Sequence, residues 1–315
     1  MTIQQMFMGT NSAGASYFWY GERGLFGGGG QPGSDYINVI NYITIASTGN
    51  AQDFGDLSLG RDQLASSGSS GRGIFGGGCC PRRDRIDYVT IATAGNATDF
   101  GNMDYDGYNV AGCSDLTRVY FGGGDTSDSP SVTDKMTLVT ALSPGNAYDF
   151  GNLTQARYGS GGASNGTRGV WYCGAFPSSP NYSNVLDYFT MASLGNASDF
   201  GDNAFGVYRS AGTGSTGRGL FCGGYSDPLG GYSDHIKYVD ISTTGNTSQF
   251  GDMTAGRRSM GMNCSETRAV IAGGQGSPAP YTNVIEYVTI ASTGNASDFG
   301  DLPTATHNLA GCSGD

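Results

Sequence analysis

The chain of 315 residues is poor in histidine and in basic side chains. It has two histidines, and its 16 Lys and Arg against 27 Asp and Glu give a formal net charge of −11. An acidic surface repels phosphate backbones and anionic lipids, so no binding to nucleic acid is expected. Nucleophilic triads need a histidine oriented by an acid. His235 follows Asp234, but neighbouring strand residues point to opposite faces, so neither His235 nor His307 is predicted to be catalytic.

Long apolar runs and paired cysteine spacings are also missing. No stretch approaches the roughly 20 apolar residues of a membrane span, and residues 1–8 lack the basic start and cleavage pattern of a signal peptide. We therefore expect synthesis in a cytoplasm and no membrane insertion. The seven cysteines show no Cys-x-x-Cys spacing. Cys113, Cys264 and Cys312 are assigned to one repeat position, and Cys173 and Cys222 to another, where other repeats carry small residues. This pattern predicts small buried side chains rather than disulfides or metal ligands, and no cofactor is predicted.

The chain instead repeats one phrase six times. Gly-Asn-x-x-x-Phe-Gly recurs at 49–55, 95–101, 145–151, 195–201, 245–251 and 294–300, with spacings between its asparagines of 46, 50, 50, 50 and 49 residues. A fixed period near 50 indicates one supersecondary unit copied in series. Glycine is frequent (55 residues) and falls at fixed places in the units, so it indicates ordered turns rather than disorder.

Each unit predicts four short strands. In residues 254–303, a small-residue strand A covers 254–264, an apolar strand B covers 269–272 and ends on Gly273-Gly274, a β-branched strand C covers 284–291, and strand D begins at 299. An arginine precedes or opens strand B in every unit, at Arg23, Arg72, Arg118, Arg168, Arg218 and Arg268. Strand C carries a tyrosine in five units and Leu138 in the third. The phenylalanines of the repeated phrase are predicted to wedge between neighbouring units.

Four strands at this period are typical of a propeller blade. The order of Arg, Gly-Gly, Tyr and a later aromatic residue resembles the kelch repeat over nearly the whole chain, with Phe where kelch units usually carry Trp. We therefore predict an all-β, six-bladed kelch-like β-propeller over residues 21–315, with four antiparallel strands per blade. Residues 304–314 fit strand A well and residues 13–20 fit it badly. The C-terminal strand is thus predicted to complete the first blade and close the ring.

Residues 1–20 are then left outside the ring as an N-terminal arm. The arm is rich in methionine and aromatic side chains, namely Met6, Phe7, Met8, Tyr17, Phe18 and Trp19. An apolar segment outside a closed domain covers something. Two alternatives stay open, that it folds back on its own propeller or that it docks on a partner or a second copy.

The B–C loops are the parts that do not repeat, and they should share one face of the disk. Tyrosine-bearing variable loops on a rigid scaffold are a common design for recognition, although such loops also drift freely where no ligand constrains them. The candidate binding residues in these loops are Tyr36, Arg82, Arg83, Arg85, Asp125, Asp128, Phe176, Tyr182, Tyr225, Tyr232 and Tyr281.

Acidic and amide side chains surround the repeated phenylalanine, as in Asp53 and Asp56 of the first unit. Asn and Asp are what turns prefer. Calcium ligation through these oxygens is the alternative reading.

The phrase Tyr-Val-Thr-Ile-Ala-Ser-Thr-Gly-Asn-Ala-Ser-Asp-Phe-Gly-Asp-Leu (287–302) resembles repeats in predicted virion structural, tail-fibre-like proteins of marine bacteriophages. The resemblance implies a non-enzymatic virion protein, made in the host cytoplasm, that contacts other virion proteins through the arm. Its B–C loops would bind a host-surface glycan or protein. The alternatives are a capsid or tail decoration protein without a receptor role, an intracellular kelch-type interaction module and, last, an enzyme.

Overall fold

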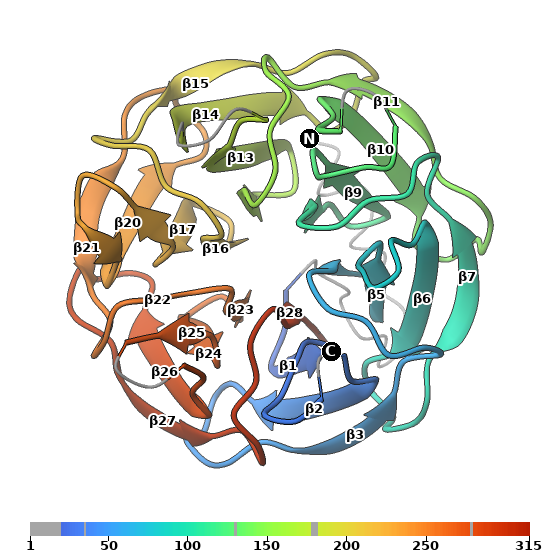
Figure 1. Ribbon diagram of the computed structural model, residues 1–315, viewed down its shortest axis with the longest axis vertical. Helices are drawn as coiled ribbons and strands as arrows, with labels where there is room; N and C mark the ends of the chain where they lie inside the picture. The colour runs from blue at the N-terminus through green and yellow to red at the C-terminus, as the bar shows by residue number, and fades with distance from the viewer. Residues whose placement is uncertain (1–19, 35, 129–130, 178–181, 278–279) are drawn as a thin grey trace, which may run out of the picture.

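The computed structural model describes residues 20–34, 36–128, 131–177, 182–277 and 280–315, and Figure 1 shows them as a ring of blades around a central axis. Within these residues the secondary structure is entirely strand, turn and loop. The described part of the chain has no helix of the length and apolarity needed to cross a membrane.

Each of the first three blades is a four-stranded antiparallel sheet. From the axis outward, their strands are β28 (Ala310–Gly314), β1 (Arg23–Gly27), β2 (Val39–Thr44) and β3 (Gln52–Asp56) in blade 1; β4 (Ala65–Ser69), β5 (Arg72–Gly76), β6 (Arg85–Thr90) and β7 (Thr98–Asn102) in blade 2; and β8 (Ala111–Ser114), β9 (Arg118–Gly122), β10 (Lys135–Thr140) and β11 (Tyr148–Asn152) in blade 3.

The other three blades repeat this order. Their strands are β12 (Gly161–Ser164), β13 (Arg168–Ala175), β14 (Tyr182–Thr190) and β15 (Ser198–Asp202) in blade 4; β16 (Ala211–Gly214), β17 (Arg218–Cys222), β20 (His235–Asp240) and β21 (Ser248–Asp252) in blade 5; and β23 (Gly261–Cys264), β24 (Arg268–Ala272), β26 (Val284–Thr289) and β27 (Ser297–Asp301) in blade 6. Two short ribbons pair β18 (Tyr225–Ser226) with β19 (Gly231–Tyr232) and β22 (Arg257–Arg258) with β25 (Gln275–Gly276).

The ring is closed by the C-terminal strand. β28 pairs antiparallel with β1, so that Leu25 faces Cys312 and Gly27 faces Ala310. The six-bladed all-β architecture and the closing strand predicted from the repeats are therefore confirmed. Closure gives β1 a partner on its axial side and removes a free sheet edge.

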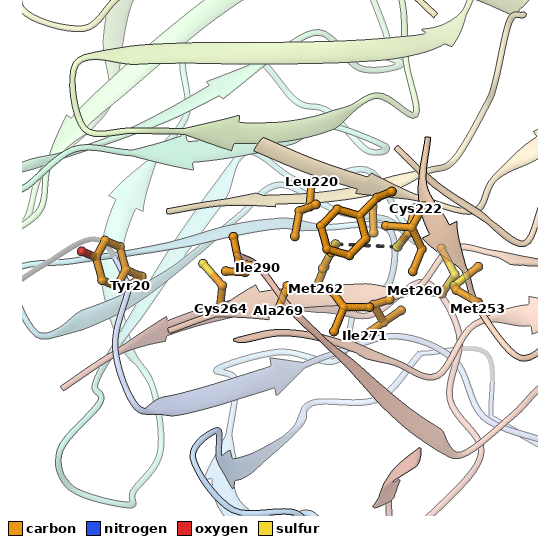
Figure 2. Packing of buried hydrophobic residues seen from close by; sticks show 14 residues of the cluster. Tyr20, Leu220, Cys222, Met253, Met260, Met262, Cys264, Ala269, Ile271 and Ile290 are labelled. Carbon is orange, nitrogen blue, oxygen red and sulfur yellow. Dashed lines mark hydrogen bonds between the residues drawn. The ribbon is translucent and has the colours of Figure 1, made fainter. Parts of the chain in front are cut away.

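Six hydrophobic clusters fill the six blade interfaces, and each contains one phenylalanine of the repeated phrase. Those side chains, at most 3 % exposed, are Phe54, Phe100, Phe150, Phe200, Phe250 and Phe299. Figure 2 shows the cluster between blades 5 and 6, where Met262 and Cys222 place their sulfur atoms 3.7 Å apart. The predicted inter-blade wedges are confirmed, and burial of such aromatic side chains is a main source of stability.

The asparagine of the phrase clamps each blade to the one before it. The Asn96 Oδ1 atom accepts a hydrogen bond from the Asp56 backbone N–H at 3.1 Å, and the same contact recurs at every interface, ending with Asn50 and Asp301. Each bond joins the asparagine of one repeated phrase to the residue that directly follows another phrase. These bonds explain why the asparagine is present in all six units.

The arginines that open strand B form a second set of clamps. Arg23 Nη1 donates to the backbone oxygens of Ile91 and Ala92 in the next blade, and the arginines of blades 2, 4, 5 and 6 each donate to one or two backbone oxygens of the following blade. Blade 3 differs, because Arg118 pairs with Asp115 instead. Tyr120 compensates, since its hydroxyl donates to the Met191 backbone oxygen in blade 4 at 2.8 Å.

Glycine lets the six inner strands approach one another closely around the axis. A Cβ atom on Gly212 of β16 would lie 2.7 Å from the Gly162 backbone oxygen of β12. A Cβ on Gly311 of β28 would lie 2.6 Å from the Met262 oxygen of β23. Hydroxyls link the strands further, as where Ser164 Oγ donates to the Ser114 oxygen at 2.7 Å. A cavity of about 30 Å³ is left along this part of the axis.

Buried ion pairs occur in every second blade. The connection from strand D of one blade to strand A of the next is called the D–A connection. Each ion pair joins an arginine in this connection to a carboxylate on strand C of the blade that the connection enters. The pairs are Arg61–Asp87 (3.0 Å), Arg157–Asp187 (2.8 Å) and Arg257–Glu286 (2.6 Å) in blades 2, 4 and 6. A hydroxyl donates to each carboxylate, from Ser58, Thr154 and Thr254 respectively. The odd blades place Asn41, Thr137 and Lys237 at the carboxylate position.

The cysteines require two corrections. Strand registers place Cys264 beside Ala269, one position beyond Cys113 and Cys312, so these three do not share a repeat position. Cys173 and Cys222 are likewise one position apart, because Cys173 takes the left-handed conformation (φ 54°) that Gly223 has in blade 5. Cys79 and Cys80 form a disulfide between adjacent residues, which the expectation of small buried side chains missed. The other five cysteines are free and buried, as predicted.

Candidate functional site

The antiparallel order places all B–C loops and all D–A connections on one face of the ring, here called the loop face (Figure 1). The A–B and C–D turns lie on the opposite face, the turn face. Tyr20, the first described residue, is buried near Cys264, and Gly21 donates to the Cys264 backbone oxygen, which is at the turn face. The chain therefore enters the ring on the side away from the loops. The predicted anchoring residues Met6, Phe7, Met8, Tyr17, Phe18 and Trp19 lie outside the described residues.

A closed ring of six backbone hydrogen bonds surrounds the axis at the loop face. One residue per blade contributes its N–H and its carbonyl oxygen, with N–O distances from 2.8 to 3.0 Å. We call these residues the collar; they are Gln63, Asn109, Gly159, Arg209, Ser259 and Asn308. All six have positive φ angles, between 53° and 69°. Five are not glycine, and such conformations are costly and cluster at functional sites.

The buried ion pairs position the collar. Arg61, Arg157 and Arg257 each lie two residues before a collar residue, so three of the six D–A connections are held to their blades by an arginine and a carboxylate. The collar encloses a pocket of about 70 Å³ at the loop-face end of the axis. None of the twelve residues that line this pocket is an aspartate or a glutamate.

The collar side chains carry polar groups into this pocket. Arg209 Nη2 reaches across the axis to the opposite collar residue, donating to Gln63 Oε1 at 2.7 Å. Asn308 Nδ2 donates to Asp62 Oδ2 at 2.9 Å, and burial raises the pKa of Asp62. Four buried atoms of the pocket have no hydrogen-bond partner within the described residues. They are Asn109 Nδ2, Arg209 Nε, Ser210 Oγ and Ser259 Oγ.

A group of half-buried tyrosines lies beside the collar over blades 4 and 5. This tyrosine cluster comprises Tyr158, Tyr182, Tyr208, Tyr225 and Tyr232. The rings of Tyr182 and Tyr208 stack 5.6 Å apart, and Tyr158 meets Tyr208 edge-on at 5.3 Å. Burial raises the pKa of Tyr158 and of Tyr182, so both phenols stay protonated donors at neutral pH.

Two arginines border the cluster. The Arg258 guanidinium lies 5.6–5.9 Å from the ring centres of Tyr208, Tyr225 and Tyr232, and it is held by two hydrogen bonds to Gln275 Oε1. Arg209 lies 5.1 Å from the Tyr208 ring. Such cation–π contacts stabilise both partners and fix the arginines over the aromatic surface.

Of the predicted loop residues, Tyr182, Tyr225 and Tyr232 are brought together in this cluster. The others lie elsewhere on the loop face. Arg82 pairs with Asp125 at 2.7 Å, and Tyr281 stacks on His307 with ring centres 4.2 Å apart. Tyr36 and Asp128 are exposed and Phe176 is half-buried. Arg83 is half-buried. Arg85 is the first residue of β6, and its Nε donates to Ser58 Oγ at 2.7 Å.

The D–A connections supply site residues that sequence reasoning missed, above all Tyr158, Tyr208, Arg209 and Arg258. The sequence predicts that these residues belong to a continuous strand A. In the structure, strand A of blades 4, 5 and 6 begins only at Gly161, Ala211 and Gly261, so the four residues precede it. A signal was present, since Tyr108, Tyr158 and Tyr208 recur every 50 residues directly before the collar. A position that recurs in every unit is expected to be structural, so the pattern alone does not mark it as a binding position.

His235 differs from its prediction in one respect. It begins β20, and its Nδ1 lies 2.9 Å from Asp252 Oδ1 and 3.6 Å from Asp234 Oδ1. Asp234 does not point away from His235 as predicted, because it precedes the strand. Among the described residues, these three have ligand atoms close enough together to hold a metal ion. Asp62, Cys79 and Cys80 are also close together, but the two sulfur atoms are joined in the disulfide and are not available as thiolate ligands. Asp252 follows the fifth copy of the repeated phrase, as Asp56 follows the first, and therefore belongs to the acids for which calcium ligation is the alternative reading.

Together these features define a six-bladed β-propeller with a tyrosine-rich loop face and a polar collar. No family model and no curated protein matches the chain. Among solved structures, the structure of YjhT resembles it, with a TM-score of 0.65 over 81 % of this chain and 90 % of that one. The two sequences are 11 % identical, so the likeness shows the propeller fold alone.

Proposed function

We propose that this protein is a non-enzymatic recognition module that binds a surface glycan through its loop face. The observation that carries the proposal is the tyrosine cluster. In it, five tyrosines and Arg258 lie together over two blades and stay half-buried instead of packing into the hydrophobic core. Tyrosine offers a flat apolar ring that packs on the C–H face of a sugar and a hydroxyl that hydrogen-bonds at its rim. Concave, partly apolar surfaces with a few oriented polar groups are typical of ligand sites.

The non-enzymatic part of the proposal rests on where the titratable groups lie. The lining of the collar pocket contains neither a carboxylate nor a histidine. His307 is stacked on Tyr281, and burial lowers its pKa. His235 lies on the outer part of blade 5 between two carboxylates. General acid–base catalysis at the collar would need such a group within hydrogen-bond reach of the bound ligand.

The resemblance of residues 287–302 to phage repeats supports a virion setting. In this proposal the arm of residues 1–20 attaches the ring to other virion proteins, and the loop face points to the host. The entry of the chain at the turn face supports that geometry, since an attachment there leaves the loop face free. Decoration of the capsid or tail and a kelch-type role inside the cell are the competing roles.

Binding of the purified full chain to an array of defined bacterial, algal and animal oligosaccharides tests recognition. We expect Tyr208→Ala to weaken binding about tenfold or more, because it removes the ring at the centre of the cluster. Tyr148→Ala is the matched control, since Tyr148 is a 48 % exposed tyrosine outside the loop face. Loss of binding in both variants, or in neither, would contradict the assignment of the site.

A cryo-EM map of the particle tests the setting. A ring attached through residues 1–20 with its loop face open to solvent would support a recognition role on the virion. A loop face buried against other virion proteins would instead indicate a decoration protein. Absence of the chain from purified particles would favour the kelch-type interaction module inside the cell.

A further inference from the structure

We infer that the collar pocket binds a carboxylate group, which makes the recognised glycan an acidic one. The inference rests on the proposed function in one respect only, namely that the ligand is a sugar. The carboxylate site itself follows from the collar and is tested separately below.

The unpartnered atoms of the pocket point to an acceptor ligand. Asn109 is 9 % exposed, yet its Nδ2 has no hydrogen-bond partner in the described structure. Arg209 Nε and the hydroxyls of Ser210 and Ser259 share this condition and line the same pocket. Buried polar groups are nearly always paired, and each one left unpaired is costly. All four can donate, and the amide and the guanidinium nitrogen can do nothing else.

The backbone of the collar does not compete for the ligand. Each collar N–H donates to the carbonyl oxygen of the preceding collar residue, which closes the ring on itself. A ligand in the pocket therefore meets side chains rather than free backbone groups. The set consists of one guanidinium, one amide and two hydroxyls, and a carboxylate accepts about four hydrogen bonds and prefers a charged donor.

Arg209 is held in place before the ligand arrives. Its Nη2 is fixed by Gln63 Oε1 on the opposite side of the axis, and its guanidinium lies beside the Tyr208 ring. The Nε atom has no hydrogen-bond partner among the described residues. A cation held in this way loses little conformational entropy on binding, which favours a preorganised site.

The charge and the size of the pocket agree with this ligand. Its lining carries Arg209 and no acidic side chain. Asp62, which precedes the collar residue Gln63, already accepts hydrogen bonds from Gln63 Nε2 and Asn308 Nδ2. About 70 Å³ of free volume holds a group of a few heavy atoms, because a single water needs only about 10–15 Å³ measured in this way. A sugar ring on Tyr208 would thus place an acidic substituent at the adjacent residue, Arg209.

The experiment uses the full chain labelled with 15N and three probes at equal millimolar concentrations, namely sodium acetate, sodium glucuronate and glucose, with sodium chloride as the salt control. We expect acetate and glucuronate to shift the Arg209 Nε–H and the Asn109 side-chain signals, and chloride to leave them unchanged. Glucuronate should bind about tenfold or more tightly than glucose, which has the same ring without the carboxylate.

The variants separate the charge from the fold. Arg209→Gln should remove the preference for glucuronate over glucose, whereas Arg209→Lys should retain part of that preference. Arg83→Gln is the control, since Arg83 is a loop-face arginine outside the pocket lining. Melting temperatures of all variants confirm folding.

The outcomes distinguish the two proposals. Equal binding of glucose and glucuronate, unaffected by Arg209→Gln, would overturn the carboxylate site and leave glycan recognition standing. Collar shifts with acetate but no binding of either sugar would support the carboxylate site and count against a glycan ligand. No response to any probe would overturn both.

Discussion

Close packing of the inner strands predicts that one added methyl group will destabilise the ring. In Gly212→Ala, the new Cβ would lie 2.7 Å from the Gly162 oxygen and 2.8 Å from Phe221 Cδ1, where ordinary contacts begin at 3.4 Å. β16 would have to retreat from β12 by about 0.7 Å. The atom it meets in β12 is backbone, which cannot rotate away. Overpacking of this kind costs about 1–3 kcal/mol.

Gly217→Ala is the matched control for this prediction. Gly217 lies in the same blade, in the turn between β16 and β17, and an added Cβ there would meet nothing within 4 Å. Its stability should stay unchanged or rise by up to about 1 kcal/mol, because alanine restricts the unfolded chain.

Paired thermal and urea denaturation followed by circular dichroism measures the difference. For a chain of this size, the Gly212→Ala penalty corresponds to a fall in Tm of roughly 2–10 °C. A Gly212→Ala protein as stable as Gly217→Ala would refute the argument that the inner strands touch through their backbones.

Three further predictions follow from the closing strand, the histidine stack and the buried thiols. Deleting residues 304–315 removes β28 and should abolish cooperative unfolding; a truncated chain that melts like the full one would exclude this closure. Burial lowers the pKa of His307 in the folded state, so the stability it contributes is present above the unfolded value of about 6.5 and is lost as pH falls through the folded pKa. His307→Gln should flatten that part of the stability–pH curve measured by urea titration. Burial raises the pKa of the thiol of Cys264 to about 11; after mild reduction a thiol reagent should label Cys79 and Cys80 at most, and the five buried cysteines only in denaturant.

The fold could be predicted from the sequence because each blade repeats its own local signals. The phrase around Phe54 marks a turn, a wedge and an outer strand every 50 residues, and the unpaired A-type segment at the C-terminus predicts the closure. The site was only partly predictable, since its residues meet across blades. Tyr182 and Tyr208 are far apart in their repeat units, and Arg209 contacts Gln63 across a sequence separation of 146 residues. Register was a second limit, because a shift of one residue changed the partners assigned to Cys264.

The buried ion pairs occur in alternate blades, so they recur with a longer period than the repeated phrase. Arg61, Arg157 and Arg257 are 96 and 100 residues apart, twice the spacing of the repeated phrase. In this respect the true unit is a pair of blades, and the ring has approximate three-fold symmetry beneath its six-fold one. A two-blade fragment contains every type of contact that joins an odd blade to an even one. We therefore expect three copies of such a fragment to present matching faces to one another.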